Sequence, residues 1–282
     1  MLIIRQGGMR DCKDLLDVYM NTRWTEKYTT VEQVKAVHRG IGFQKWGWLV
    51  AEVKNRVVGE VLFRVEKNPA AGRIGIITDI GVDVRYQKKG IGTNLVAAAE
   101  SALKAKKAGR LVATSPPDAY NFWMKMKWFA RGSLMDIEAS PSKIPIKKTT
   151  NISTMRLEDV TKLPKSMLFS NVAYPGLLAE TVSAVVDGGR HCVRFEFHSE
   201  DALVGVGVCA DYGNRKAMFV ADMTVSGVQY FDVVASRTAR AAIQWKARTV
   251  TSRIPSEKVQ SYGGLARWSF QLARSIPLTR LV

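Results

Sequence analysis

The fold is decided by residues 82–93, which read Val82-Asp83-Val84-Arg85-Tyr86-Gln87-Lys88-Lys89-Gly90-Ile91-Gly92-Thr93. The apolar run from Ile74 to Val84 predicts a strand, and the periodic run from Thr93 to about Lys107 predicts a helix. The turn between them carries two lysines and two glycines. Glycine permits positive φ and a close approach of the backbone. Free N–H groups in the first turn of the helix, together with the positive helix end, can then surround a phosphate.

The spacing of the glycines separates this turn from two common nucleotide-binding loops. It has neither the G-x-x-x-x-G-K-S/T spacing of a P-loop nor the G-x-G-x-x-G spacing of a dinucleotide fold. A G-x-G pair alone is weak evidence, because many strand–helix turns need glycine for their geometry. Lys88 and Lys89 add mobile cations at the mouth of the turn.

At these residues the sequence resembles the GNAT superfamily, the acyl-CoA-dependent N-acyltransferases. Residues 87–92 match the pyrophosphate loop Q/R-x-x-G-x-G/A of that family, and the expected valine, Val82, stands five residues before the glutamine. Residues 119–128 echo a later helix motif, A-x-x-F-Y-x-K-x-G-F. The two motifs lie about 30 residues apart, as they do in the family.

The resemblance implies an α/β (α+β) fold with a mixed, mostly antiparallel sheet flanked by helices. We expect a GNAT acetyltransferase domain over residues 1–145, ending in the linker Ser140–Pro145, and a degenerate GNAT-like domain over residues 146–282. The second half repeats the order of residues 40–138, namely strands, helix, strand, helix and strand, so we expect two tandem domains. The last strands of the two halves are predicted at residues 134–138 and 273–281.

In the family, two central strands splay apart and pantetheine enters the gap. By resemblance, the backbone of Ile80, Val82 and Val84 would pair with pantetheine, and the N–H groups of residues 88–93 would hold the pyrophosphate. A backbone N–H close to Val82 would polarise the thioester carbonyl. The residues expected to bind the cofactor are Ile80, Val82, Val84, Gln87, Lys88, Lys89, Gly90, Ile91, Gly92, Thr93, Phe122 and Lys125.

Two departures from the family affect the predicted catalytic residues. The tyrosine that commonly protonates the leaving thiolate falls at Trp123, whose indole is a very poor acid, and Tyr120 could take its place from one helical turn earlier. A packing or surface tyrosine is the alternative interpretation. The position where some members carry a glutamate is Ile76, which leaves Asp79 as the candidate base, directly or through a water. A structural carboxylate is the competing interpretation of Asp79.

The second half lacks the features of a pyrophosphate site. Residues 261–268 weakly echo the later helix motif, but residues 225–231, which precede a predicted helix, hold one glycine and no cation. We therefore expect this domain to buttress the first domain or to shape the cleft for the acceptor.

The protein is strongly basic. Its 282 residues include 42 Lys/Arg and 25 Asp/Glu, a net charge of +17, and residues 1–150 hold 26 of the former and 14 of the latter. Such a field attracts polyanions: nucleic acid, a phosphate-rich cofactor or an acidic partner. Plain solubility is the alternative. Nucleic acid is thus possible but not predicted, and a strongly cationic acceptor such as a polyamine is disfavoured.

The cysteines give no framework for disulfides or metal. Cys12, Cys192 and Cys209 are odd in number and show no C-x-x-C pairing. His191 and His198 lie near two of them, but the spacing matches no common zinc pattern, so we expect strand residues and no metal. No apolar run approaches the ~18 residues of a membrane span, and residues 2–4 are too short for a signal-peptide core. A cytoplasmic protein without membrane contact is expected.

These observations predict an acetyl-CoA-dependent N-acetyltransferase. Its acceptor would be a primary amine of a protein or small molecule, which attacks the thioester directly in a ternary complex. A non-catalytic GNAT-like module that binds CoA or nucleic acid is the alternative. The protein is expected to be a monomer or a homodimer.

Overall fold

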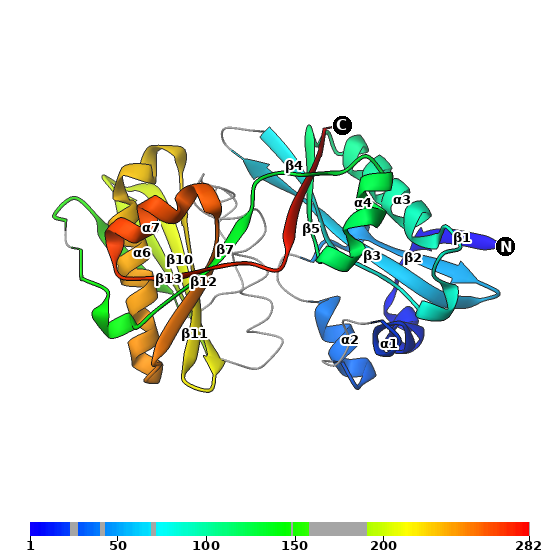
Figure 1. The fold of residues 1–282 in the computed structure, drawn as a ribbon, viewed down its shortest axis with the longest axis horizontal. Helices are drawn as coiled ribbons and strands as arrows, with labels where there is room; N and C mark the ends of the chain where they lie inside the picture. The colour runs from blue at the N-terminus through cyan, green and yellow to red at the C-terminus, as the bar shows by residue number, and fades with distance from the viewer. Residues whose placement is uncertain (23–27, 40–42, 69–71, 148, 158–190, 282) are drawn as a thin grey trace.

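The computed structural model describes residues 1–22, 28–39, 43–68, 72–147, 149–157 and 191–281. The protein forms two lobes, and each is built on a mixed sheet (Figure 1). The first sheet consists, in spatial order, of β1 (Leu2–Gln6), β2 (Trp48–Val53), β3 (Arg56–Asn68), β4 (Gly72–Val82), β5 (Arg110–Ser115), β14 (Ile276–Leu281) and β6 (Phe129–Ala130). The second consists of β13 (Ser269–Leu272), β7 (Leu134–Ala139), β12 (Thr249–Pro255), β11 (Lys216–Met223), β10 (Ala202–Gly213), β9 (Cys192–Ser199) and β8 (Ser153–Leu157).

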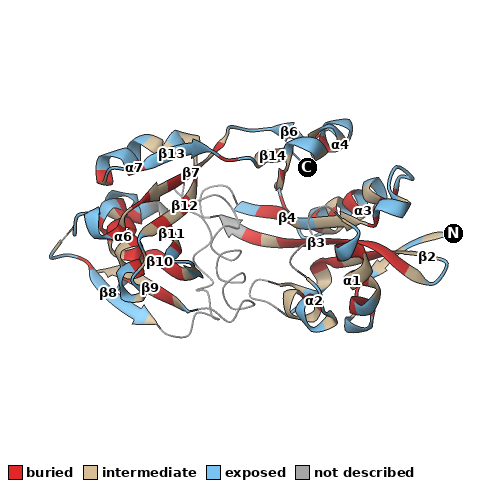
Figure 2. Cartoon of the chain, turned by 60° about the horizontal axis from the view of Figure 1, so that its bottom comes forward, coloured by how far each residue is buried: buried red, intermediate tan, exposed pale blue. Residues whose placement is uncertain are grey.

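Helices cover both faces of the first sheet. On one face, α1 (Cys12–Met20) and α2 (Val31–Val37) bury Leu15 and Val34 against β2 and β3. On the other face, α3 (Ile91–Ala105) buries one apolar stripe, and α4 (Tyr120–Lys125) packs beside it. In the second lobe, α6 (Phe231–Arg240) and α7 (Val259–Leu265) share one core with the sheet. Figure 2 shows these buried faces turned toward the sheets.

Local signals in the sequence account for the helix and strand ends. Thr30 caps α2, because its hydroxyl accepts from the amide of Gln33 at 3.3 Å. Lys54 and Asn55 both have positive φ, 51° and 61°, as a two-residue hairpin turn requires. Asp11, in contrast, makes no cap bond to α1; its carboxylate accepts from the amide of Gly8 and from Arg5 instead.

Two strands belong to the sheet of the other half of the chain, and not to the sheet of the half in which they stand in the sequence. β7 pairs with β12 and β13 in the second sheet, and β14 pairs with β5 and β6 in the first. The expectation that each half keeps its own last strand is therefore wrong. Because both halves have the same strand order, either strand suits either position, and sequence pattern does not distinguish them. The green and red crossings between the lobes in Figure 1 are these two strands.

The exchanged strand β14 is firmly held in the first lobe. Leu278 is only 2% exposed and belongs to the core under α3. Arg280 donates through Nη1 to Glu100 Oε1 on α3 at 2.9 Å, and Trp128 Nε1 donates to the same oxygen at 2.7 Å. The first core thus depends on residues that are far away in the sequence.

The predicted internal repeat is confirmed, and it extends to single contacts. The first sheet, counted from β1, and the second sheet, counted from β8, have the same order of strands, with β14 in the first sheet at the position that β7 takes in the second. The amide of Asp83 after β4 donates to Val58 O at 2.9 Å, and the amide of Thr224 after β11 donates to Val204 O at 3.0 Å. The end of β11 is therefore the counterpart of the end of β4.

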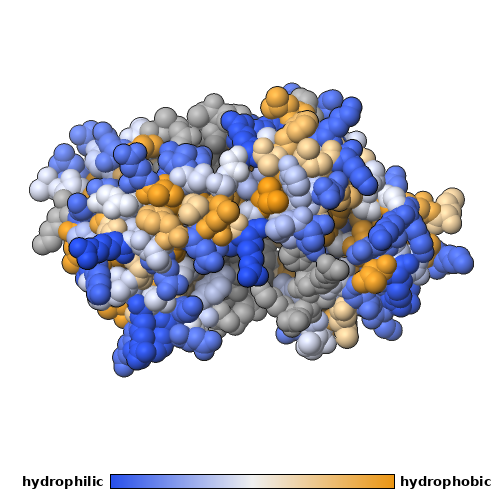
Figure 3. All heavy atoms as spheres, viewed as in Figure 1, coloured by the Kyte–Doolittle hydropathy of each residue, from blue (hydrophilic) through white to orange (hydrophobic). Residues whose placement is uncertain are grey.

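One face of the protein is drawn by hydropathy in Figure 3. The face drawn in Figure 3 is mostly hydrophilic, with scattered apolar residues. Within the described ranges, no helix is both long and apolar enough to cross a bilayer.

Candidate functional site

A gap opens in the first sheet between β4 and β5. These parallel strands pair only through Ile74, Gly75 and Ile76 on β4, opposite residues 110–112. β4 then continues to Val82 alongside β3, whereas the rest of β5 pairs with β14 on its other edge. Beyond Ile76, the edge of β4 that faces β5 therefore has no strand partner among the residues that the structure describes.

A β-bulge in β4 sets which side chains face this gap. The register with β3 shifts between Leu62 and Phe63, so that β4 has one extra residue, and Thr78 Oγ1 donates to Leu62 O at 3.2 Å. An extra residue reverses the alternation of side chains. Consequently Ile80 and Val82 lie half-buried on the α3 side, where Ile77 also lies.

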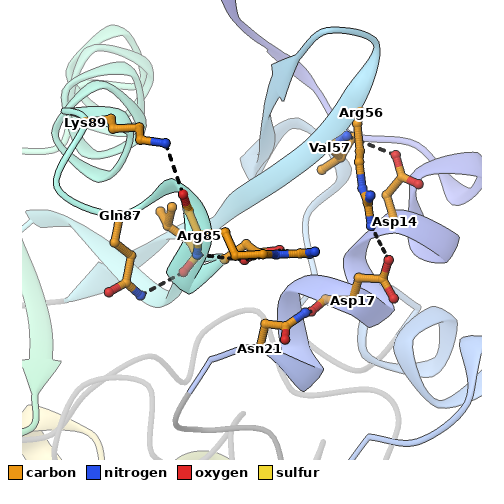
Figure 4. A network of polar contacts seen from close by, with 10 residues as sticks. Asp14, Asp17, Asn21, Arg56, Val57, Arg85, Gln87 and Lys89 are labelled. Carbon is orange, nitrogen blue, oxygen red and sulfur yellow. Dashed lines mark hydrogen bonds and ion pairs between the residues drawn. The ribbon is translucent and has the colours of Figure 1, made fainter.

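The turn after β4 is clamped by an ion pair. Asp83, 2% exposed, accepts from the amide and from Nε of Arg85, both at 3.0 Å. Hydrogen bonding from Arg85 holds the pKa of this carboxyl below its usual range. Figure 4 shows the Arg85 side chain extending toward Asp17 on α1, which pairs with Arg56 of β3. The Arg85 side chain therefore lies on the side of the turn that faces α1.

The turn ends in a set of uncommitted amides. Gly90 is the N-cap of α3 with φ +77°, in the left-handed region that favours glycine. The first helical bond runs from the amide of Asn94 to Gly90 O at 3.0 Å. Within the described part of the chain, the amides of Lys88 and of residues 90–93 have no hydrogen-bond acceptor, whereas the amide of Lys89 closes the hydrogen-bonded turn at residues 87 and 88. Free N–H groups at the positive end of a helix fit a phosphate group.

Glycine at position 92 lets an aromatic ring approach this cradle. A Cβ atom there would lie 3.4 Å from the ring of Phe122 and 3.8 Å from Val82. Phe122, Val82 and the start of α3 therefore meet at one place. Lys125 is exposed at the end of the helix that carries Phe122.

The remaining predicted cofactor residues differ in their placement. Lys88 is exposed, with φ 59°. Lys89 Nζ donates to Arg85 O at 3.0 Å and lies 5.2 Å from the centre of the Tyr86 ring. Val84 was expected to continue the strand, which is wrong: β4 ends at Val82, and Val84 begins a 3-10 turn in which its carbonyl accepts from the amide of Gln87 at 3.3 Å.

The two predicted catalytic residues lie on opposite faces of the sheet. Asp79 is exposed and stands opposite Leu62, a residue of the core under α1 and α2. Tyr120 is half-buried against the core under α3. Trp123, at the position of the family's tyrosine, is 2% exposed and packs edge-on against Trp128. The gap between β4 and β5 is where these two faces meet.

A buried polar cluster on the α1 face was missed at the sequence level. Glu60, 1% exposed, accepts from the Tyr19 hydroxyl, from Trp48 Nε1 at 2.9 Å and lies 2.9 Å from His38 Nε2. Since His38 Nδ1 also lies 2.7 Å from Val34 O, the ring fits a doubly protonated imidazolium that donates at both nitrogens. Burial lowers the pKa of His38, but the Glu60 carboxylate outweighs it, and the net shift is upward.

This cluster lies directly beside the gap strand. Glu60 stands opposite Gly81, which lies between Ile80 and Val82. An isolated carboxylate inside the apolar run 57–63 was the available signal, because a charge in a buried strand needs partners. The cluster fixes α1 and α2 to the sheet beside the gap strand β4.

The equivalent place in the second lobe shows the same divergence, since β11 and β12 pair only through residues 216–218 opposite residues 249–251, but its side chains are buried. Ala221 and Met223, the counterparts of Ile80 and Val82, are each 1% exposed. The turn that follows β11 folds back onto β10, so that a Cβ atom at Gly227 would lie 1.9 Å from Val204 O. The second sheet therefore repeats the divergence of the two strands, but the β11 side chains beside it are buried.

Comparison with known proteins agrees with this geometry. Residues 13–128 match the acetyltransferase (GNAT) family. This part of the chain is therefore similar to that family. The matched residues include the gap strand β4, the amide cradle and α4. The sequence matches none of the curated proteins.

Solved structures place the whole chain in a tandem GNAT fold. A tandem GNAT protein from the clavulanic acid biosynthesis pathway is 14% identical over 100% of this chain and 98% of its own, with a TM-score of 0.57. A GCN5-related N-acetyltransferase from Anabaena variabilis is 9% identical over 100% of this chain and 73% of its own, with a TM-score of 0.63. One from Sphaerobacter thermophilus is 10% identical over 99% and 95%, with a TM-score of 0.53. At such identities the likeness shows the fold alone.

Proposed function

We propose that the protein is an acetyl-CoA-dependent N-acetyltransferase whose active site is the gap between β4 and β5. The observation that carries this is an edge of β4 that has no strand partner among the described residues, next to the free amides of Lys88 and residues 90–93. Both lie in the part of the chain that matches the GNAT family. The buried side chains of Ala221 and Met223, at the counterpart in the second lobe, support a single donor site.

The residues present fit the donor. The amides of residues 88–93 would hold the diphosphate, with Lys88 at the mouth, and the edge of β4 at Ile80 and Val82 would pair with the pantetheine amides. Acetyl-CoA supplies a thioester carbonyl to which an amine can add. Asp79, on the α1 face, would take the proton of the acceptor amine, and Tyr120, on the α3 face, would supply a proton to the leaving sulfur.

The acceptor side suits a neutral or mildly polar amine rather than a polyanion. Charged groups of the described residues around the gap are largely paired with one another: Arg85 with Asp83, Arg56 with Asp17, and His38 with Glu60. A small amino compound or an exposed amine of a protein fits such an environment.

A substitution in the cradle tests the proposal. Gly90→Ala forces a side chain into φ +77° without a clash, since the nearest atom would lie 3.7 Å away. We expect calorimetry to show acetyl-CoA binding to the wild type and weaker binding to this variant. Gly213→Ala is the matched control, because Gly213 has φ +74°, open surroundings and a place in the second lobe. Equal affinities for both variants, or a wild type that does not bind acetyl-CoA, would contradict the proposal.

A non-catalytic module that binds CoA is the second candidate. The buried Trp123 at the position of the usual acid favours it. Tight CoA binding without acetyl transfer to a broad panel of amines would select this candidate over the enzyme.

A further inference from the structure

The last carbonyl of β4 points into the gap. The amide of Asp83 donates to Val58 O on β3 at 2.9 Å, and no cis peptide occurs in the described chain. In a trans peptide, the C=O of one residue points opposite to the N–H of the next. Val82 O therefore points away from β3, toward the side on which β5 has diverged.

This carbonyl is already occupied by a side chain of the protein. Gln87 Nε2 donates to Val82 O at 2.9 Å, and Figure 4 shows the Gln87 side chain folded back from the turn to make this bond. Gln87 is exposed and follows the 3-10 turn 84–86, so its side chain can leave without disturbing a core. The Asp83–Arg85 pair holds the backbone of the turn independently of Gln87.

We propose that Gln87 is a displaceable placeholder for the pantetheine amide of the acyl donor. This inference rests on the proposed function, because Val82 is one of the β4 residues expected to pair with pantetheine. A side-chain amide and a pantetheine amide present the same N–H donor to a peptide carbonyl. Without a donor molecule, Gln87 satisfies Val82 O; when the donor enters, its amide replaces that of Gln87.

The hydrogen bond from Gln87 to Val82 O must break before the acyl donor can pair with this carbonyl, so it lowers the affinity of the protein for the donor by the free energy of that bond. A neutral hydrogen bond of this kind corresponds to a factor of about 2 to 10 in an equilibrium constant. Removing it should therefore strengthen the binding of ligands that contain pantetheine by that factor. Ligands that reach only the amide cradle at residues 88–93 should be unaffected.

A structural brace is the competing role for Gln87, and it predicts the opposite result. If the bond shaped the turn for the diphosphate, its removal would weaken every ligand that uses the cradle. It would also lower the thermal stability of the protein.

The test compares two ligands and three variants of the full chain by isothermal titration calorimetry. The ligands are CoA and adenosine 3′-phosphate 5′-diphosphate, which lacks pantetheine. The variants are Gln87→Ala, Gln87→Met, which keeps the length of the side chain without its donor, and Asn94→Ala. Asn94 is the matched control, because Nδ2 donates to Gly90 O at 2.8 Å in the same turn.

The placeholder predicts that both Gln87 variants bind CoA about 2- to 10-fold more tightly than the wild type and bind the nucleotide fragment equally. The control should not tighten CoA binding. Unchanged or weaker CoA binding by the Gln87 variants, with a wild type that does bind CoA, overturns the placeholder and leaves the proposed function intact. A wild type that binds no CoA overturns both.

Discussion

Leu278→Ala should destabilise the first domain, although the residue follows the whole second domain in the sequence. Leu278 is 2% exposed in the core under α3 and pairs with Ala113 of β5 and Ala130 of β6. The change removes three buried carbons, worth about 0.8 kcal/mol each by transfer, to which the cavity adds. We expect a loss of about 3 kcal/mol in the free energy of unfolding.

Leu281→Ala is the control, because this leucine lies on the same strand and is 78% exposed. Its substitution should change stability by less than about 0.5 kcal/mol. Denaturant unfolding gives the size of the effect, and amide hydrogen exchange gives its location. Exchange should accelerate first in β5 and β6 for Leu278→Ala. Equal losses for the two variants, or faster exchange confined to β10 and β11, would show that β14 does not complete the first sheet.

Three further predictions concern the site. His38→Gln should cost more stability below pH 6.5, the ordinary pKa of histidine, than well above it. Because the pKa of His38 is raised in the folded protein, its bond to Glu60 stabilises the fold fully below pH 6.5, and this stabilisation is lost as the pH rises through the raised pKa. Urea unfolding at several pH values measures the effect, and the absence of this trend would contradict an imidazolium at position 38. Tyr120→Phe should lower kcat by about 10²-fold with little change in CoA affinity, and an unaltered kcat would leave Tyr120 as a packing residue. Asp79→Asn should lower kcat by a similar factor of about 10² and remove the acid limb of the pH–rate profile; a profile of unchanged shape would assign Asp79 a structural role.

The sequence predicted most elements, since their signals are local. The apolar run before Val82 and the glycines at positions 90 and 92 depend only on neighbouring residues, and the strand, the turn and the helix after it stand where these indicate. The exchange of β7 and β14 depends instead on which sheet edge each strand meets, and two equivalent edges give no local signal. The end of β4 at Val82 reflects the bond from Asp83 to β3, which a continuous apolar pattern hides.

The candidate site was predictable in part for the same reason. Backbone chemistry at residues 88–93 follows from glycine spacing, whereas the cluster around Glu60 gathers side chains from α1, β2, β3 and the end of α2. None of these is adjacent in sequence, and only the isolated carboxylate in an apolar strand indicated them. The placeholder bond of Gln87 spans five residues, but it depends on the turn that the Asp83–Arg85 pair imposes.

The strand exchange has a consequence for synthesis of the protein. A ribosome delivers the gap strand and the amide cradle early, but β14, which borders β5, emerges only after residue 276 has been translated. Until then, the edge of β5 is exposed and the first core lacks Leu278. Messages cut short before this point would yield chains with every candidate active-site residue and an unfinished sheet around them, so quality control by proteases could remove them before they acted.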